Sequence, residues 1–364
     1  MIKKLLIATC LVFTLFTLYS NKVWAQENLE GKVTKILEEK EVEIMGSKQP
    51  FQRLEILITK GSLKDQKLII ENGNLPLANV VKYKTNDRVN INREQGLDGN
   101  DIFDITDFIR RDSLLLLFII FVVVTIVVGK WRGFSSVVSL TLTFLVIFYF
   151  ILPQISQGTS PILITIIGSI IIIPITFYVS HGFNKKTTVA VVSTLFGMVF
   201  IGVMSTLFIG LSKLTGLSSE EAGMLLSLKN GDFNMQGILL AGIMIGALGV
   251  LDDITISQAS IVEQLREALP VASISEIYKR ASKIGQDHIT SVVNTLILVY
   301  AGASMPLLLM FVDNPHPFSE IINYEFIAEE IVRTLVGSVG LILTVPLTTL
   351  IACLSFQKNN EKNK

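Results

Sequence analysis

Two adjacent aspartates, Asp252 and Asp253, are the most conspicuous polar residues in the apolar part of this sequence. A carboxylate inside a membrane costs about 2.5–3.5 kcal/mol on insertion scales, and it usually has a function where it occurs. The pair can therefore bind a proton or a cation during transport. Alternatively, the pair lies at the membrane interface and caps the next helix, because exposed N–H groups at a helix start favour Asp. Glycines at four- and three-residue spacing precede the pair and predict a smooth face for close helix packing: Gly242, Gly246 and Gly249.

A second polar cluster, formed by Glu329, Glu330 and Arg333, stands at the start of the last apolar stretch. Glu330 and Arg333 are three residues apart, so on a helix they can pair and lower the cost of placing both near lipid. Glu329 is interpreted as an interfacial cap. Arg333, one turn further along, is the better functional candidate.

Helix breaks are a weaker signal of a transport path. Asn294 lies inside the apolar stretch 290–312, and Pro306 and Pro346 predict kinks in this stretch and in the last one. Kinks free backbone carbonyls that can line a cavity. Proline kinks are also common in membrane proteins that transport nothing.

Several kinds of chemistry are excluded by the motifs that the sequence lacks. It has no Gly-x-x-x-x-Gly-Lys-Ser/Thr loop for ATP and no His-Glu-x-x-His motif for a zinc protease. Adjacent Asp252 and Asp253 project about 100° apart on one helix, which does not fit an intramembrane aspartyl protease. Cys10 and Cys353 stand at opposite ends of the chain, which excludes a disulfide framework or a cysteine metal site. We therefore expect neither an enzyme nor a bound cofactor or metal.

Apolar stretches must position these residues. Half of the residues (50 %) are hydrophobic and 17 % are charged, and a spanning helix needs about 20 mostly apolar residues. The sequence predicts a mainly α, polytopic membrane helix bundle over 112–356. Its predicted spans are 113–129, 136–153, 161–180, 188–210, 236–252, 290–312 and 330–355.

The distribution of positive charge predicts the orientation of the spans. Lysines and arginines fall in every second connection, which places these connections in the cytoplasm. The segment before the first span is then outside, and the tail 357–364 is in the cytoplasm. We expect the chain in the bacterial cytoplasmic membrane, in contact with the lipid bilayer. The residues that carry the signal are Lys130, Arg132, Lys185, Lys186, Arg266, Lys279, Arg280, Lys283, Lys358, Lys362 and Lys364.

The N-terminal part has a different composition. Residues 1–25 are typical of a signal peptide, with Lys3 and Lys4 before an apolar stretch and Ala25 at the end. An uncleaved anchor is the alternative, and either one exports the next segment. Residues 26–111 are polar and alternate in places, which predicts a small extracytoplasmic β-barrel or sandwich of five or six strands. Asn72-Gly73 and Asp98-Gly99 are its strongest turn signals.

Residues 254–288 predict a cytoplasmic loop of two short amphipathic helices. Apolar residues at four-residue intervals mark the first helix, and Pro270 ends it. Ser273 and Glu276 predict a capping box at the start of the second. The helices either pack on the bundle, lie on the inner membrane surface or dock a cytoplasmic partner.

Three separated stretches carry a specific pattern: Gly-Val-Leu-Asp-Asp-Ile-Thr-Ile-Ser-Gln at 249–258, a stretch from Asp-His-Ile to Tyr-Ala-Gly-Ala-Ser at 287–304, and Glu-Ile-Val-Arg-Thr-Leu-Val-Gly-Ser at 330–338. With the apolar segments around them, they resemble the YibE/F family of bacterial multi-pass membrane proteins. The resemblance implies no particular reaction. It groups six polar residues as one set: Asp252, Asp253, Asp287, His288, Asn294 and Arg333.

Two classes of function remain open. The leading hypothesis is a secondary transporter or channel-like permease for an ion or small solute, in which Asp252 or Asp253 carries the proton or cation and Arg333 balances the charge. The competing hypothesis is a membrane sensor or assembly scaffold whose outer β domain binds a ligand or partner. The partners expected are lipid and a second copy or another membrane protein, and no nucleic acid.

Overall fold

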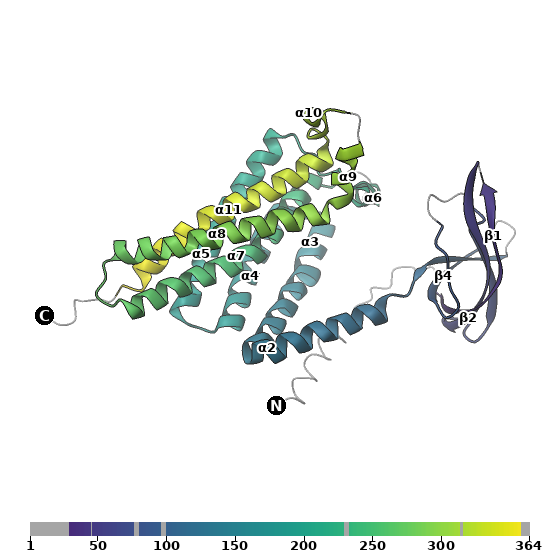
Figure 1. Cartoon of the computed structure of the whole chain (residues 1–364), viewed down its shortest axis with the longest axis horizontal. Coiled ribbons are helices and arrows are strands. Elements are labelled where there is room, and N and C mark those ends of the chain that lie inside the picture. Colours follow the sequence, from purple (N-terminus) through teal and green to yellow (C-terminus); the bar gives the residue numbers. More distant parts are fainter. Residues whose placement is uncertain are drawn as a thin grey trace. The chain divides into compact units, whose positions relative to one another are not determined.

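The computed structural model describes residues 29–44, 46–75, 80–95, 100–228, 233–313 and 316–357. The predicted signal peptide, the Asp98-Gly99 turn and residues 358–364 lie outside the described residues. The chain divides into two compact units, Met1–Val124 and Thr125–Lys364. The first contains the β-strands and the start of the first long helix, and the second contains the remaining helices (Figure 1).

The first unit is built on one antiparallel sheet. Its strands are β1 (Leu29–Ile44), β2 (Ser47–Lys60), β3 (Lys67–Asn72), β4 (Arg88–Gln95) and β5 (Asp101–Phe108), in the order β3-β2-β1-β4-β5. The long β1 pairs with β2 along its length and with β4 only at its start, through 29–32. The edge strands β3 and β5 also approach each other. A five-stranded sheet that curls in this way has the architecture of a partly open OB-type barrel.

Alternation along the strands explains the core of the sheet. On β2, Leu54, Ile56 and Ile58 are each 0 % exposed, because every second side chain of a strand points to the same face. The predicted turn at Asn72-Gly73 is present. Gly73 has φ 85°, and a Cβ there would lie 2.1 Å from the Pro50 carbonyl oxygen, so only glycine fits.

Among the described residues, five helices are long and apolar enough to cross a membrane: Arg111–Ser156, Pro161–His181, Lys185–Leu211, Met235–Ala268 and Glu325–Ser355. The first combines α2 (Arg111–Val146), a π-helical turn at Ile147–Ile151 and α3 (Leu152–Ser156). The other four are α4, α5, α7 and α11, in that order. The shorter or more polar helices are α6 (Glu220–Leu228), α8 (Ile274–Ala303), α9 (Met305–Asp313) and α10 (Phe318–Ile321).

The helix α2 is interrupted where the sequence predicts a connection between two spans. Lys130 has non-helical φ 52° and ψ −129°, which breaks α2 into two pieces. Gly133 then packs directly on the preceding piece, since a Cβ there would lie 2.0 Å from the Thr125 carbonyl oxygen. The break expected between 113–129 and 136–153 is therefore present.

The predicted stretch 290–312 does not form a single long helix. It comprises the end of α8 and the short α9, with a break at Ser304 just before Pro306. The kink predicted at Pro306 is thus a complete interruption, because proline cannot donate a backbone hydrogen bond. By contrast, α11 continues through Pro346 to Ser355.

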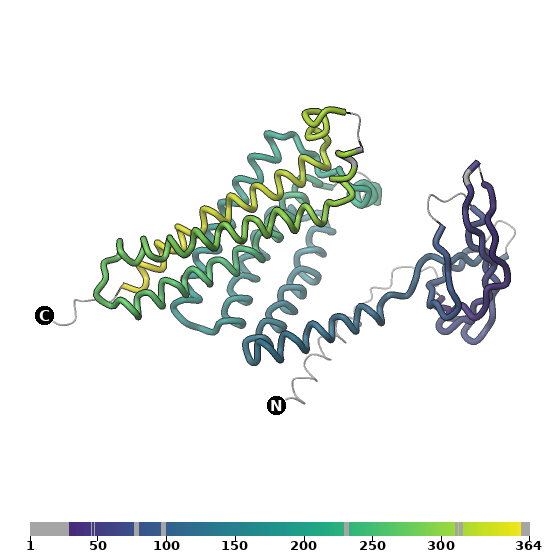
Figure 2. Tube along the Cα trace, viewed as in Figure 1, coloured from purple at the N-terminus to yellow at the C-terminus, as the bar shows by residue number. Residues whose placement is uncertain are grey.

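The two amphipathic segments of 254–288 are not separate helices. The first is the continuation of α7 to Ala268, and the second is the first part of α8, so the two form an antiparallel hairpin (Figure 2). Its turn has the predicted cap, in which the Glu276 backbone N–H donates to Ser273 Oγ over 3.1 Å. Apolar residues between the helices and α11 explain the extension, since they form one buried cluster: Val189, Ala259, Val262, Ile277, Ala281, Ala352 and Cys353.

Candidate functional site

Buried hydroxyl and amide side chains run through the contacts between α5, α7 and α11. Thr194 of α5 and Thr255 of α7 are 0 % exposed and share a hydrogen bond of 2.8 Å. Gln258 of α7 donates to Thr349 Oγ1 of α11 over 2.7 Å and to the Ala281 carbonyl of α8 over 3.1 Å. We call these residues, with the other buried hydroxyls of the three helices, the polar seam. The others are Thr187, Ser193, Ser205, Ser338, Thr344 and Thr348.

Two glycines allow α5 and α11 to approach closely at the polar seam. A Cβ at Gly197 would lie 2.6 Å from Thr344 Oγ1, and one at Gly340 would lie 2.2 Å from Ile201 Cγ1. Close backbone contact at small residues is typical of membrane helices. The sequence analysis selected other glycines for this role. Within the described residues, a Cβ at Gly242 or Gly249 would meet no atom within 4 Å, and one at Gly246 only the Tyr300 hydroxyl at 3.6 Å.

Asp252 and Asp253 lie in the interior of α7. The interpretation that they cap a following helix is therefore wrong, because α7 continues to Ala268. Asp252 is partly buried, and its Oδ1 has no hydrogen-bond partner in the described part of the chain. Asp253 is exposed. Of the two, Asp252 is the group whose surroundings leave an oxygen available to a ligand.

Arg333 pairs with Glu330 as predicted, over 3.3 Å. It lies eleven residues before Thr344, or about 16 Å along the helix at 1.5 Å per residue. Thr344 and Leu251 both lie against Gly197, so they mark the level of Asp252. Arg333 and Asp252 thus occupy different depths of the bundle, and they do not form a pair.

The remaining members of the predicted set lie on α8. Asp287 and Asn294 are exposed, and His288 is partly buried. No hydrogen bond or ion pair joins the six predicted residues to one another within the ranges that the structure describes. Those ranges also contain no group of three or more His, Cys, Asp or Glu side chains able to hold a metal ion. The structure therefore distributes the set along the bundle and does not gather it into one centre.

A carboxyl pair that the sequence analysis missed lies at the start of α11. Glu329 is only 6 % exposed, accepts from Ser218 Oγ over 2.6 Å through Oε2, and has no partner for Oε1 in the described residues. Glu325, one turn earlier, accepts from Thr215 Oγ1 over 2.7 Å and from the backbone N–H groups of Thr215 and Gly216. Glu329 is a buried side chain and not an interfacial cap. Their four-residue spacing is the signal that the sequence offered.

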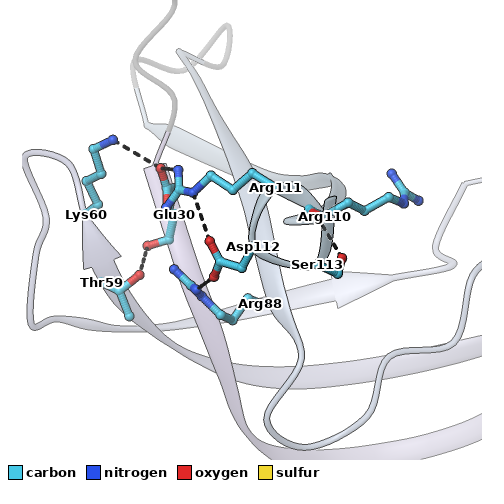
Figure 3. A network of polar contacts seen from close by, with 8 residues as sticks. All are labelled: Glu30, Thr59, Lys60, Arg88, Arg110, Arg111, Asp112 and Ser113. Atoms are coloured by element: carbon cyan, nitrogen blue, oxygen red, sulfur yellow. Dashed lines mark hydrogen bonds and ion pairs between the residues drawn. The ribbon is translucent and has the colours of Figure 1, made fainter. Parts of the chain in front are cut away.

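Another buried carboxylate joins the sheet to the first apolar helix (Figure 3). Glu30 of β1 accepts from both Arg111 Nη atoms, over 2.7 and 2.6 Å, and from Lys60 Nζ over 3.3 Å. Arg88 of β4 pairs with Asp112, the second residue of α2. The Arg111 guanidinium, with Lys60, holds the pKa of the Glu30 carboxyl below its usual value, although burial opposes this.

One groove of the helical unit is apolar. It has a volume of about 780 Å³ between α4, α5 and α7 and contains none of the predicted site residues. Apolar side chains supply most of its wall, which suits a lipid chain better than a polar solute. Its lining includes Ile166, Leu195, Met198, Val203, Leu240 and Met244.

A sequence model of YibE/F-like proteins matches residues 117–358, which include most of α2, the helices from α3 to α11 and all six predicted site residues. The matched range excludes the β sheet. Neither a curated protein nor a solved structure matches the chain.

Proposed function

Since the chain belongs to the YibE/F-like family, we propose that it is a secondary transporter or channel-like permease for an ion or small solute. The polar seam carries this proposal. A core packed only for stability in lipid has little need of so many buried hydroxyl and amide groups, because each must be satisfied within the protein. As proposed, the chain moves a solute and catalyses no covalent reaction.

The proposed location is the bacterial cytoplasmic membrane, with seven spans and the β domain outside. Two spans are assigned to Arg111–Ser156, whose 46 residues are more than twice the about 20 that one span needs. A further span is assigned to the end of α8 with α9. At one end of the bundle, Lys186 pairs with Glu263 over 3.1 Å, and Lys185 lies over the Phe356 ring. This grouping of basic residues supports a cytoplasmic position for that end.

In this proposal Asp252 binds the transported or coupling ion. Its Oδ1 has no hydrogen-bond partner in the described residues, and an unsatisfied buried polar atom costs about 1–3 kcal/mol. Binding of a cation or a proton at this oxygen would remove that cost. Its position one residue after Leu251, which packs at the polar seam, supports this role. Arg333 and Glu330 lie eleven and fourteen residues before Thr344 on α11, or about 16 and 21 Å from the level of Asp252, and are assigned to the opposite part of the path.

Cysteine accessibility at the polar seam tests the proposal. Thr344→Cys and Thr255→Cys are made in a Cys10→Ser, Cys353→Ser background and treated with small membrane-impermeant thiol reagents. The matched control is Leu343→Cys, because Leu343 is 47 % exposed, on a side that the proposal assigns to lipid, whereas Thr344 is 2 % exposed. Only a hydrated cysteine forms the reactive thiolate. We expect both seam cysteines to react and the control to stay unmodified.

A change of the seam reaction rates under an imposed proton gradient, lost in Asp252→Asn, supports ion coupling. A cysteine introduced at a fully exposed position of the same background serves as the positive control. If it reacts normally and both seam cysteines fail to react, a hydrated path is ruled out. The sensor or scaffold hypothesis then becomes the better one.

One observation favours a sensor or scaffold as the second candidate. The Glu30–Arg111 contact fixes the sheet to the first residues of α2, so a ligand on the sheet would act directly on a membrane helix. The exposed polar residues Ser291 and Asn294 of α8 also need water or a protein partner at membrane depth. A homo-oligomer or another membrane protein would supply it.

A further inference from the structure

We propose that Glu325 and Glu329 form a proton-binding site that holds the connection 212–219 against α11. The two carboxyl groups lie one helical turn apart on α11, and two ionised carboxylates offer no donor to each other. Glu329 Oε1 is buried and has no partner in the described residues. A proton on this oxygen supplies the missing donor. The site does not require that the chain transports anything.

The surroundings decide which of the two groups carries the proton. Glu325 Oε1 receives three donors, two backbone N–H groups and the Thr215 hydroxyl, and such donors favour the ionised form. Glu329 receives one, from Ser218 Oγ, and is 6 % exposed. Burial with few donors favours the neutral acid. Glu329 is thus the acid, and Glu325 is the carboxylate that accepts from it.

The charged groups that act on Glu329 are Glu325, Glu330 and Arg333, all on α11. On the connection that packs against it, Thr215, Gly216 and Ser218 contribute neutral donors, and Lys213 is exposed. The competing arrangement pairs Glu329 with Arg333, whose Nε also lacks a partner in the described residues. That arrangement keeps Glu329 ionised, so the protonation state separates the two.

The proton has a structural consequence. Ser218 and Thr215 belong to the connection between α5 and α6, and both bind to the carboxyl pair of α11. Loss of the proton would place two negative charges one helical turn apart, one of them on the buried Glu329, which is unfavourable. The repulsion between them would strain the contact between the connection and α11, so the site makes this contact sensitive to pH.

Infrared difference spectroscopy of the full chain at neutral pH tests the site through the C=O stretch of protonated carboxylic acids. The variant is Glu329→Gln, whose amide can donate to Glu325 as the acid does. The matched control is Glu330→Gln, at the neighbouring residue that pairs with Arg333. We expect the wild-type minus Glu329→Gln spectrum to contain one protonated carboxyl band and the wild-type minus Glu330→Gln spectrum to contain none.

Ser218→Ala gives an independent reading if Glu329→Gln does not fold. It removes one hydrogen bond from the acid, so we expect the band to shift and to persist. Absence of the band from the wild type, or a band unaffected by both substitutions, would overturn the proposal in favour of the Arg333 pair. Loss of the wild-type band when sodium chloride replaces N-methylglucamine chloride would also overturn it, because the site would then hold a metal cation.

Discussion

Glu30 in the sheet and Glu329 in the helical unit are almost equally buried carboxyl groups with opposite surroundings. Their exposures are 8 % and 6 %. Glu30 lies between two positively charged side chains, Arg111 and Lys60. One oxygen of Glu329 instead accepts from the uncharged Ser218 hydroxyl, and the other has no partner in the described residues. Burial alone therefore does not set the charge of a glutamate. The number and kind of its donors do.

The largest effect is expected from Glu30→Gln. It removes a bidentate ion pair and leaves Arg111, which is about half exposed, to be solvated by water. We expect the sheet to lose about 2 kcal/mol of stability. Hydrogen exchange of β1 and β4 amides in the full chain measures the loss. An unchanged exchange rate would mean that the Glu30–Arg111 contact contributes nothing to the stability of the sheet. The contrast between Glu30 and Glu329 would then not hold.

Acid should weaken the sheet through the same residue. The pKa of Glu30 is held below its ordinary value of 4.5 in the folded protein, so its contribution is fully present above that pH. It decreases as the pH falls from there through the lower, folded-state pKa. The hydrogen-exchange difference between wild type and Glu30→Gln should therefore shrink on acidification. A difference that stays constant would show that Glu30 is not ionised in the folded sheet.

Arg111→Lys should destabilise the sheet less than Glu30→Gln, and it separates the effect of charge from that of hydrogen-bond geometry. A lysine keeps the positive charge but cannot form two parallel hydrogen bonds with Glu30. The expected loss is about 1 kcal/mol, measured by the same exchange experiment. A loss as large as that of Glu30→Gln would mean that geometry, and not charge, holds the contact.

The smallest effect is expected from Glu329→Gln. If Glu329 is already a neutral acid, the substitution removes no charge, and the thermal midpoint of the full chain should change little. Glu329→Ala should be clearly less stable, since it leaves Ser218 and Glu325 without their partner. If Glu329→Gln lowers the midpoint as much as Glu329→Ala does, the carboxylate is ionised and resembles Glu30 after all.

Local patterns predicted much of the fold. The helices α4 and α5 begin and end within about three residues of the predicted spans 161–180 and 188–210, as the uncertainty of such boundaries allows. The break at Lys130 and the cap at Ser273 were also predicted, because basic residues and capping side chains act within a few residues of their own position.

Long-range contacts were beyond the reach of the sequence. Glu329 depends on Ser218, which is 111 positions away, and no pattern within α11 reveals that neighbour. The contacts at Gly197 and Gly340 depend on how two helices align, and helix periodicity does not specify the alignment. The two halves of the α7–α8 hairpin were predicted as helices separate from the neighbouring spans. Helical periodicity alone does not show where a span ends and an amphipathic helix begins, because both have the same period.

The extension of α7 beyond Asp252 makes this helix a lever. Sixteen residues separate Asp252 from Ala268, a rigid arm of roughly 24 Å. A tilt of roughly 10° about Asp252 moves the end of such an arm by roughly 4 Å. Glu263, near that end, is joined to Lys186 over only 3.1 Å. A small rotation about Asp252 would thus produce a larger displacement towards the far end of the helix, where this contact lies.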